Sequence, residues 1–365
     1  MIISPKNRTV YNFRGDLIKA LQAKGFEVLV TGPDQTEREM IDALGVRFVE
    51  LPMNKTGTDP LADLRYCLSL WKLIRKERPD RILAYTVKPV VYGGLAARLA
   101  GHRHFYSLIT GGGYIFAAST LKARLLGLVV RTLYRASLSS SRATIFQNDD
   151  DRQEFIGRGL VKGDKTRVVA GSGVNLDAFP AAPMPADPSF LMVSRLLGSK
   201  GVMEYLQAAA LVRQSHPHAR FALVGQYEDT MQDALSREAI DHYFETGIVA
   251  RHGETDDVRP FYRDCGVYVL PSYREGTPRT VLEAMATGRP VITTDTNGCR
   301  DTVQEGVNGF LVPPRDARAL AERMSWCLQH PDQLAAMGEA SRRLCEEQYD
   351  VHLVNRSMLD MMGVT

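Results

Sequence analysis

The stretch that decides the fold is Val267-Tyr-Val-Leu-Pro-Ser-Tyr-Arg-Glu-Gly-Thr-Pro-Arg-Thr-Val-Leu-Glu-Ala-Met-Ala-Thr-Gly-Arg-Pro290. It opens with four apolar residues, which predict a buried parallel strand that Pro271 ends. Thr277 is expected to cap a helix with Pro278 at its first position, where a missing N–H costs nothing. The helix is expected to end at Gly288. In an open α/β sheet, ligands bind where a strand passes through a loop into a helix N-terminus.

Charged and polar groups gather around this helix N-terminus. The N–H groups of Gly276 and Thr277 predict an anion site, which the helix dipole strengthens. Glu275 and Glu283 are separated by seven residues. Glycosidase carboxyl pairs lie roughly 5–9.5 Å apart, whereas eight helical steps span about 12 Å. We therefore expect the two glutamates to contact different parts of one long ligand; the alternative is one surface salt-bridge residue and one buried polar residue.

Bulk composition is that of a soluble globular protein. With 365 residues the chain is long enough for two α/β domains, each with its own core. We expect no signal peptide and no membrane span, since no uncharged apolar stretch reaches about 18 residues. The five cysteines are scattered without a C-x-x-C pair, which indicates reduced thiols in a cytosol. The histidines lack a ligand cluster, so we expect no metal site.

Charge is distributed unevenly along the chain. Residues 1–175 hold 27 Lys and Arg against 16 Asp and Glu, a net charge of +11, and residues 176–365 hold 18 against 26, a net charge of −8. Different partners are expected for the two halves. A membrane surface, a pyrophosphate or a nucleic acid would suit the basic half, but no RNA-binding or DNA-reading motif is present. We therefore expect no nucleic-acid partner.

Strands and helices are expected to alternate through the first half. The strands are expected at 1–4, 26–31, 46–51, 81–85 and 104–109, and the helices at 12–24, 35–44, 59–78 and 90–100. This order predicts a parallel sheet with helices on both faces. Four prolines within 179–188 predict a linker. The expected first domain is therefore 1–178 and the second begins at 189.

A second loop of chemical interest opens the second domain. Arg195 and Lys200 stand five residues apart at an expected strand-to-helix turn, a spacing that suits a diphosphate. The alternative is a pair of solvated charges at a helix start. Downstream, Gly225 is expected to give a nucleotide room, and the loop that contains His252 is expected to edge the base.

Two segments of the basic half also invite a functional interpretation. Gly111, Gly112 and Gly113 follow a strand and predict close backbone approach to a ligand, or a flexible turn. In the helix expected at 121–139, three arginines fall within about 40° of one another beside a leucine face. Such a basic stripe suits anionic lipid, and a solvated helix face is the alternative. The stripe consists of Arg124, Arg131 and Arg135.

The segment from Arg274 to Ala286 resembles the E-x7-E signature of retaining, GT-B-fold glycosyltransferases of family 4. The resemblance places Glu275 near the donor sugar hydroxyls and Glu283 on the nucleotide ribose. Arg195 and Lys200 resemble the family's G-R-L-x-x-x-K-G segment, with Ser194 in place of glycine, and would hold the donor diphosphate without a metal or other cofactor. The catalytic set implied is Glu275, Arg195 and Lys200, and the donor-binding set is Ser194, Arg195, Lys200, Gly225, His252, Glu275, Gly276, Thr277, Pro278 and Glu283.

The resemblance also implies an overall architecture and an acceptor side. Two Rossmann-like domains would face each other across a cleft, 1–178 for the acceptor and 189–347 for the nucleotide sugar, and a helix within 348–365 would cross back to the first domain. Thr110 stands where many relatives have a histidine, which weakens any assignment of a histidine base. The acceptor-side residues implied are Arg14, Gly15, Lys88, Thr110, Gly111, Gly112 and Gly113.

The segments 11–15 and 85–89 resemble the subgroup that builds bacterial capsule, exopolysaccharide and lipid-linked oligosaccharide. The reaction implied is retaining transfer of a sugar, with an N-acetylhexosamine as one candidate, from a UDP-sugar to a hydroxyl of a polyprenyl-diphosphate-linked or other glycan. The protein would be cytoplasmic and peripheral on the inner face of the cell membrane. The alternatives are a GT-B-fold UDP-sugar 2-epimerase, which would lack this E-x7-E context, and a non-catalytic sugar-nucleotide-binding protein.

Overall fold

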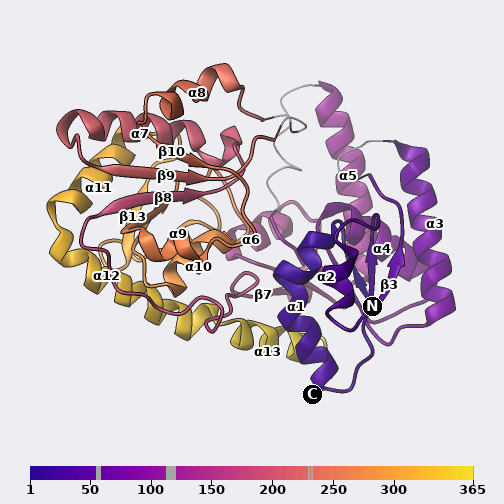
Figure 1. Ribbon diagram of the computed structural model, residues 1–365. Helices are drawn as coiled ribbons and strands as arrows, with labels where there is room; N and C mark the ends of the chain where they lie inside the picture. The colour runs from indigo at the N-terminus through magenta and orange to yellow at the C-terminus, as the bar shows by residue number, and fades with distance from the viewer. Residues whose placement is uncertain (55–58, 112–120, 229–230, 232, 365) are drawn as a thin grey trace. The chain divides into compact units, whose positions relative to one another are not determined.

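The computed structural model describes residues 1–54, 59–111, 121–228, 231 and 233–364, and the backbone alone at 121–126. The chain divides into two compact units (Figure 1). Unit 1 comprises Met1–Ser172 with His352–Thr365, and unit 2 comprises Gly173–Val351. Each unit contains one parallel sheet between layers of helices, so the prediction of two Rossmann-like α/β units is confirmed.

The sheet of unit 1 has seven strands in the order β3-β2-β1-β4-β5-β6-β7. The inner strands are fully buried, as expected for parallel strands covered on both faces, and the edge strands β3 and β7 are largely exposed. Their bounds are Ile2–Ile3 (β1), Leu29–Gly32 (β2), Arg47–Glu50 (β3), Ile82–Tyr85 (β4), Phe105–Ile109 (β5), Ala143–Phe146 (β6) and Thr166–Val168 (β7).

Two apolar cores, one on each face of this sheet, hold the helices of unit 1. Neighbouring strand residues alternate between them: Ile2 belongs to the core that contains α1 and α13, and Ile3 to the core that contains α3, α4, α5 and α6. The helices are Asn7–Ala23 (α1), Arg38–Asp42 (α2), Pro60–Glu77 (α3), Val87–Leu99 (α4), Leu121–Ser140 (α5), Asp149–Gly157 (α6) and Val351–Met361 (α13).

The first helix begins earlier than predicted, at Asn7 instead of residue 12. Val10 is fully buried in the core, and Asn7 donates its side-chain amide to the carbonyl oxygens of Asp34 and Thr36. These tertiary contacts fix a first turn that the local sequence leaves open. Helix α4 likewise begins at Val87, three residues before the predicted start.

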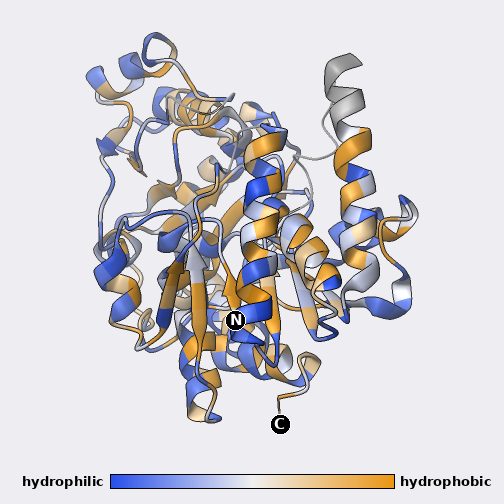
Figure 2. Ribbon diagram, turned by 90° about the vertical axis from the view of Figure 1, so that its right-hand side faces the viewer, coloured by the Kyte–Doolittle hydropathy of each residue, from blue (hydrophilic) through white to orange (hydrophobic). Residues whose placement is uncertain are grey.

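The sheet of unit 2 has six strands in the order β10-β9-β8-β11-β12-β13, all parallel. The strands are Ser189–Val193 (β8), Arg220–Val224 (β9), Ala250–His252 (β10), Val267–Leu270 (β11), Val291–Thr294 (β12) and Gly309–Val312 (β13). The helices are Val202–Ser215 (α7), Arg237–Glu245 (α8), Arg259–Asp264 (α9), Arg279–Ala286 (α10), Ala317–Gln329 (α11) and Pro331–Leu344 (α12). Figure 2, in which unit 1 faces the viewer, shows hydrophobic residues along the strands of the unit 1 sheet.

The boundary between the units lies before the proline-rich segment that suggested a linker. That segment is fastened to unit 2, because the guanidinium of Arg289 donates to the carbonyl oxygens of Ala182 and Pro183 at 3.2 and 2.9 Å. Arg289 is fully buried and lies more than a hundred residues away in sequence. Proline content alone therefore does not distinguish a linker from a segment held in place by a distant donor.

Among the described residues, no helix is long and apolar enough to cross a membrane.

The last helix, α13, supplies apolar side chains to the core of unit 1. Val354, Met358 and Leu359 are buried among residues of β1, β2 and α1. Arg81 also donates to the carbonyl oxygens of Met362 and Gly363 at 2.7 and 2.5 Å. The C-terminal segment thus belongs structurally to unit 1, although unit 2 precedes it in the chain.

We expect Met358→Ala to destabilise unit 1 by about 2–4 kcal/mol, since it leaves a cavity in a packed core. Leu353→Ala on the exposed side of α13 is the matched control and should change stability by less than about 0.5 kcal/mol. Urea unfolding monitored by circular dichroism measures both variants. Equal losses would show that α13 does not anchor through its buried face.

Candidate active site

The candidate site of unit 2 lies where the strand order of its sheet reverses. Strand β8 pairs with β9 on one side and with β11 on the other, so the loops that follow β8 and β11 leave the same sheet edge in divergent directions. The predicted strand at 267–270 is confirmed as β11, and all four of its residues are buried. The loop after β11 and the loop after β8 carry most of the predicted donor-binding residues.

Helix α10 begins one residue later than predicted. Pro278 is the N-cap, with extended backbone angles, and Arg279 is the first helical residue. Thr277, the expected cap, therefore lies in the loop. Pro278 has no N–H, and its carbonyl oxygen accepts from Val281 at 3.1 Å to close the first turn. The helix N-terminus still points to the same edge of the sheet as Glu275 and Gly276.

Two glycines allow the loops at this edge to approach closely. Gly201 has a φ of +72°, and a Cβ there would lie 2.0 Å from the carbonyl oxygen of Pro271. At Gly225 a Cβ would lie 1.9 Å from the carbonyl oxygen of Ser194. No side chain fits at either position. The loops after β8, β9 and β11 are thus held backbone against backbone.

This close approach brings Lys200 and Glu275 into contact. The Lys200 ammonium lies 2.5 Å from Oε1 of Glu275, and their side chains are 25% and 14% exposed. Lys200 ends a short 3-10 turn, Gly198–Lys200, and the N–H of Glu275 donates to the carbonyl oxygen of Asn297. The two residues are 75 positions apart in sequence, and the reversal of strand order places them together.

Arg195 pairs with a carboxylate that the sequence did not suggest. Its Nη1 lies 3.2 Å from Oε2 of Glu228, which follows β9. Arg195 is 45% exposed, so this ion pair is accessible to solvent. Ser194 uses its hydroxyl to donate to the carbonyl oxygen of Arg195 at 2.7 Å. The two predicted cations therefore contact different carboxylates.

Glu283 is held by two donors within α10 and α9. Nε of Arg279 lies 3.1 Å from Oε1 of Glu283, and the hydroxyl of Tyr262 donates to Oε2 at 3.1 Å. Burial raises the pKa of Glu283, and Arg279 and Tyr262 oppose that shift. Its side chain is 13% exposed, and Tyr262 is fully buried. Glu283 is thus a largely buried polar residue, as one of the two interpretations expected. A small part of its side chain remains exposed to solvent.

The remaining predicted residues of unit 2 contribute mainly backbone groups. The N–H of Gly225 donates to the carbonyl oxygen of His252 at 3.0 Å, which ties β9 to β10. The His252 ring packs edge-on against Phe261, with centroids 4.8 Å apart. His252 is therefore the last residue of strand β10 and not a loop residue as predicted, and its ring contacts a neighbouring aromatic side chain.

Sequence reasoning missed Glu228, Tyr262 and Arg279. Arg279 had a readable signal, because it lies four residues before Glu283 on the same helix. Glu228 and Tyr262 come from other elements and had no local signal.

The predicted acceptor-side residues of unit 1 are spread over several environments. Arg14 is 5% exposed, and its guanidinium lies over the Tyr85 ring at 5.1 Å from the centroid. Lys88 lies 2.6 Å from Oδ1 of Asp63. Gly15 is buried within α1, facing Leu44, and therefore does not lie at a sheet edge.

The glycine loop after β5 is described only in part. Thr110 and Gly111 are half-buried, and Gly111 has a φ of +135°. Gly112 and Gly113 lie outside the described residues.

The edge where the strand order of unit 1 reverses, between β1 and β4, carries hydroxyl groups. The hydroxyl of Tyr85 lies 2.6 Å from the Ser4 hydroxyl and 2.9 Å from the Thr9 hydroxyl. Burial raises the pKa of Tyr85, so the phenol stays neutral. Sequence reasoning did not single out this cluster, because its members lie in three separate elements.

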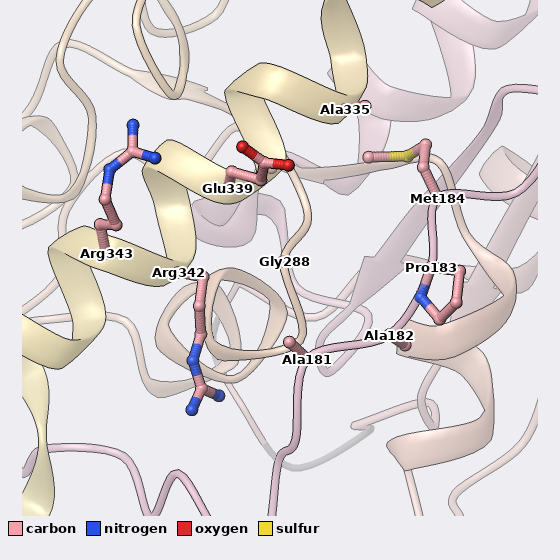
Figure 3. Close-up of a pocket in the computed structure, with 10 residues that line it drawn as sticks. Ala181, Ala182, Pro183, Met184, Gly288, Ala335, Glu339, Arg342 and Arg343 are labelled. Carbon is pink, nitrogen blue, oxygen red and sulfur yellow. The ribbon is translucent and has the colours of Figure 1, made fainter.

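One hollow, lined in part by Gly288, lies at the opposite end of α10 from the candidate site. Figure 3 shows it between α12, which contributes Glu339, Arg342 and Arg343, and the proline-rich segment with Pro183 and Met184. Its volume is about 350 Å³. Arg342 donates to the carbonyl oxygens of Phe179 and Ala286, which assigns it to packing.

Known protein families match most of the chain. Residues 12–171 match the family described as glycosyl transferase 4-like domain, and residues 187–330 match the family described as glycosyl transferases group 1. The chain belongs to the glycosyltransferases that combine these two domains. The E-x7-E segment and the loop after β8 both lie inside the second match. The expected glycosyltransferase activity is thus confirmed, and neither the epimerase nor the non-catalytic alternative gains support.

Curated relatives include two bacterial enzymes. N,N'-diacetylbacillosaminyl-diphospho-undecaprenol alpha-1,3-N-acetylgalactosaminyltransferase of Campylobacter jejuni is 27% identical and covers 98% of this chain and 96% of its own length. UDP-Gal:alpha-D-GlcNAc-diphosphoundecaprenol alpha-1,3-galactosyltransferase of Escherichia coli is 28% identical over 70% of this chain and 68% of its own.

Solved structures share the fold. HepE of Anabaena, crystallised with UDP, covers 100% of this chain and 99% of its own with a TM-score of 0.79 at 18% identity. A glycosyltransferase of Rickettsia africae covers 99% and 97% with a TM-score of 0.78 at 20% identity. At this identity the likeness establishes the GT-B fold, which confirms the predicted fold class.

Glu283 gives a prediction for stability against pH. Because burial raises its pKa above the ordinary value of 4.5, the folded protein holds this proton more tightly than the unfolded chain. The free energy of unfolding should therefore fall as the pH rises from 4.5 through the raised pKa. Glu283→Gln avoids the charge, so we expect its Tm to exceed that of the wild type at pH 7.5 by about 2–4 °C.

The difference should shrink as the pH falls to 4.5 and below, because the raised pKa favours the protonated carboxyl in the folded protein there. Glu346→Gln is the matched control, because Glu346 also accepts from an arginine four residues away but is 49% exposed. Differential scanning fluorimetry across this pH range measures both variants. A destabilised Glu283→Gln at pH 7.5 would contradict the pKa shift.

Proposed function

We propose that this glycosyltransferase moves a sugar from a UDP-sugar, with retention, to a hydroxyl of an undecaprenyl-diphosphate-linked sugar in bacterial surface glycan assembly. The observation that carries the proposal is the contact of Lys200 with Glu275 at the edge of the unit 2 sheet, in the loop that leads into α10, the helix that contains Glu283. The names of the Campylobacter and Escherichia relatives support a lipid-linked acceptor. HepE, crystallised with UDP, supports a uridine nucleotide.

The donor would exchange carboxylate partners for phosphate partners. In the structure Lys200 contacts Glu275 and Arg195 contacts Glu228. The diphosphate of the donor carries two negative charges against one on each carboxylate, and it would take over both cations. Glu275, released from Lys200, would then accept from the donor sugar hydroxyls. Glu283, with Arg279 and Tyr262 on its two oxygens, would still offer lone pairs to the ribose hydroxyls.

The chemical step follows from the same groups. As the bond from the sugar to UDP breaks, negative charge grows on the leaving diphosphate. Arg195, Lys200 and the positive end of the α10 dipole would stabilise it, without a metal. No histidine stands at Thr110, so we infer that the β-phosphate takes the acceptor proton. An N-acetylhexosamine is the donor sugar we favour.

Unit 1 would hold the acceptor at its own sheet edge. Arg14 and Lys88 are the cations available there, each positioned by a neighbour, Tyr85 and Asp63 respectively. An acceptor joined to a polyprenyl chain requires work at the inner face of the cell membrane. Of the arginine stripe proposed for lipid contact, Arg131 is half-exposed, and the side chain of Arg124 lies outside the described residues.

We expect Arg195→Ala or Lys200→Ala to lower kcat/KM by about two orders of magnitude or more, because each removes charge stabilisation on the leaving UDP. Arg220→Ala is the control, since Arg220 is 61% exposed on the same unit. The assay follows UDP release with UDP-sugars and a lipid-linked acceptor. Turnover near that of the wild type in both variants, or a strict Mg²⁺ requirement, would overturn the metal-free clamp.

The two glutamates should separate in a binding experiment. Glu283→Ala should weaken UDP itself about tenfold or more, since it loses the ribose contact, which is worth at least about 1.4 kcal/mol. Glu275→Ala should leave UDP affinity nearly intact and reduce turnover, since its partner is the sugar. Calorimetric titration of UDP into both variants measures the difference. Equal losses would show that the two roles are misassigned.

A further inference from the structure

Helix α3 presents a row of leucines to solvent. Leu61, Leu64 and Leu68 are 65%, 55% and 43% exposed, although each is a large apolar side chain. At 100° per residue they lie within about 60° of one another. The opposite side of the helix is buried in the core of unit 1, through Tyr66, Leu70 and others. Helix α3 is therefore apolar on two faces, and only one of them is covered by described residues.

Basic side chains share the exposed face. Arg65, Lys72, Arg75 and Lys76 are all exposed, and together with the leucines they fall within about 120° around the helix. The leucines lie in the first turns, and three of the four basic residues follow them. The guanidinium of Arg75 lies over the Trp71 ring at 5.4 Å from its centroid. The face thus runs from apolar to basic along the helix axis.

The acidic residues of α3 offset only part of this charge. Asp63 accepts from Lys88 of α4 at 2.6 Å and from the Tyr92 hydroxyl at 2.8 Å. Glu77 lies 3.1 Å from Arg47 of β3 and 4.0 Å from Lys76 of the same face. Asp59 caps the helix by accepting from the N–H of Leu61. Asp63 thus has its partners outside this face, and Asp59 is held by the helix backbone. Glu77 is shared between Arg47 and Lys76, so four basic groups face one shared carboxylate and the face keeps a net positive charge.

We propose that this α3 leucine face (Leu61, Leu64 and Leu68 with Arg65, Lys72, Arg75 and Lys76) binds an anionic lipid surface. The leucines would enter the boundary between headgroups and acyl chains, and the basic groups would lie at the lipid phosphates. Leu61 and Leu68 are about 10 Å apart along the axis, within the reach of an interfacial helix. The proposal rests on the proposed function for its reason, because a lipid-linked acceptor must be met at a membrane.

A lipid surface fits this face better than a protein does. A second copy of the chain would bring the same four positive charges against it. Stable protein interfaces bury about 800 Å² on each partner, and three leucines on one helix offer much less. Anionic headgroups supply the complementary charge along the whole basic part of the face.

The face on α3 also accounts for lipid contact better than the arginine stripe on α5. Arg135 donates to the carbonyl oxygens of Gly159 and Arg158 at 2.8 and 3.0 Å, so its guanidinium is engaged within unit 1. The structure thus favours a contact with an apolar part, in which salt would weaken binding but not abolish it. A purely electrostatic stripe would lose its binding at high salt.

Co-sedimentation of the full chain with vesicles tests the proposal. Vesicles of phosphatidylglycerol and phosphatidylethanolamine should bind the wild type, more weakly at 1 M salt, and phosphatidylcholine vesicles should bind much less. Changing Leu61, Leu64 and Leu68 to Gln, which keeps helix propensity, should weaken binding by about tenfold or more. The control changes three other exposed apolar residues of unit 1, Leu99, Leu128 and Val129, to Gln and should bind as the wild type does.

Further measurements keep the outcomes distinct. All five native cysteines are buried, so Leu64→Cys labelled with an environment-sensitive fluorophore should shift to the blue on anionic vesicles, and labelled Leu99→Cys should not. Unchanged vesicle binding by the leucine variant overturns the proposal. A wild-type dimer that this variant dissociates, seen by light scattering without lipid, overturns it in favour of a second copy. Thermal stabilisation by UDP, measured without vesicles, reports separately on the proposed function.

Discussion

The contact between Lys200 and Glu275 depends on a constraint of topology. Parallel strands added on both sides of β8 force the following loops of β8 and β11 to diverge from one edge, and a gap opens between them only there. Gly201 against Pro271 narrows that gap to backbone contact. The ion pair of Lys200 with Glu275 lies where these two loops meet. Helix α10, which contains Glu283, begins directly after the same loop. The order of the strands in unit 2 therefore determines which charged side chains come into contact.

The sheet of unit 1 also has a point where the strand order reverses, but different side chains lie there. Its reversal point between β1 and β4 carries Ser4, Thr9 and Tyr85, which bond to one another through neutral hydroxyls, and Arg14, whose guanidinium lies over the Tyr85 ring. The corresponding edge of unit 2 carries cations and carboxylates. A charged nucleotide sugar suits the second edge, and a neutral sugar hydroxyl suits the first. This division agrees with the proposed donor and acceptor roles, and it comes from side chains that the two folds place at equivalent positions.

The strands and the two motif loops could be predicted from local sequence. Buried parallel strands are continuous apolar runs such as 267–270, and Pro and Gly mark the turns. Local sequence also placed Arg195, Lys200 and Glu275 in the loops at one edge of the sheet and Glu283 on the helix that follows. The partners of these residues could not be predicted in the same way. Glu228 contacts Arg195 and Tyr262 contacts Glu283, and the members of each pair are 33 and 21 residues apart in sequence. The proline-rich segment shows the same limit, since its fixing to unit 2 depends on Arg289, far along the chain. The predicted helix starts were wrong where tertiary contacts determine the first turn, as at Asn7.

Glu283 illustrates how a costly group points to a role. A carboxylate this buried is destabilising when ionised, and an apolar residue of similar size would often be neutral or stabilising in its place. In the structure two donors bind this carboxylate, the guanidinium of Arg279 and the phenol of Tyr262. Neither donor neutralises the acceptor capacity of the carboxylate, because each oxygen has a second lone pair. The arrangement therefore keeps a carboxylate acceptor fixed in the second turn of α10, and the retention of a destabilising charge is expected at a binding site rather than in a core.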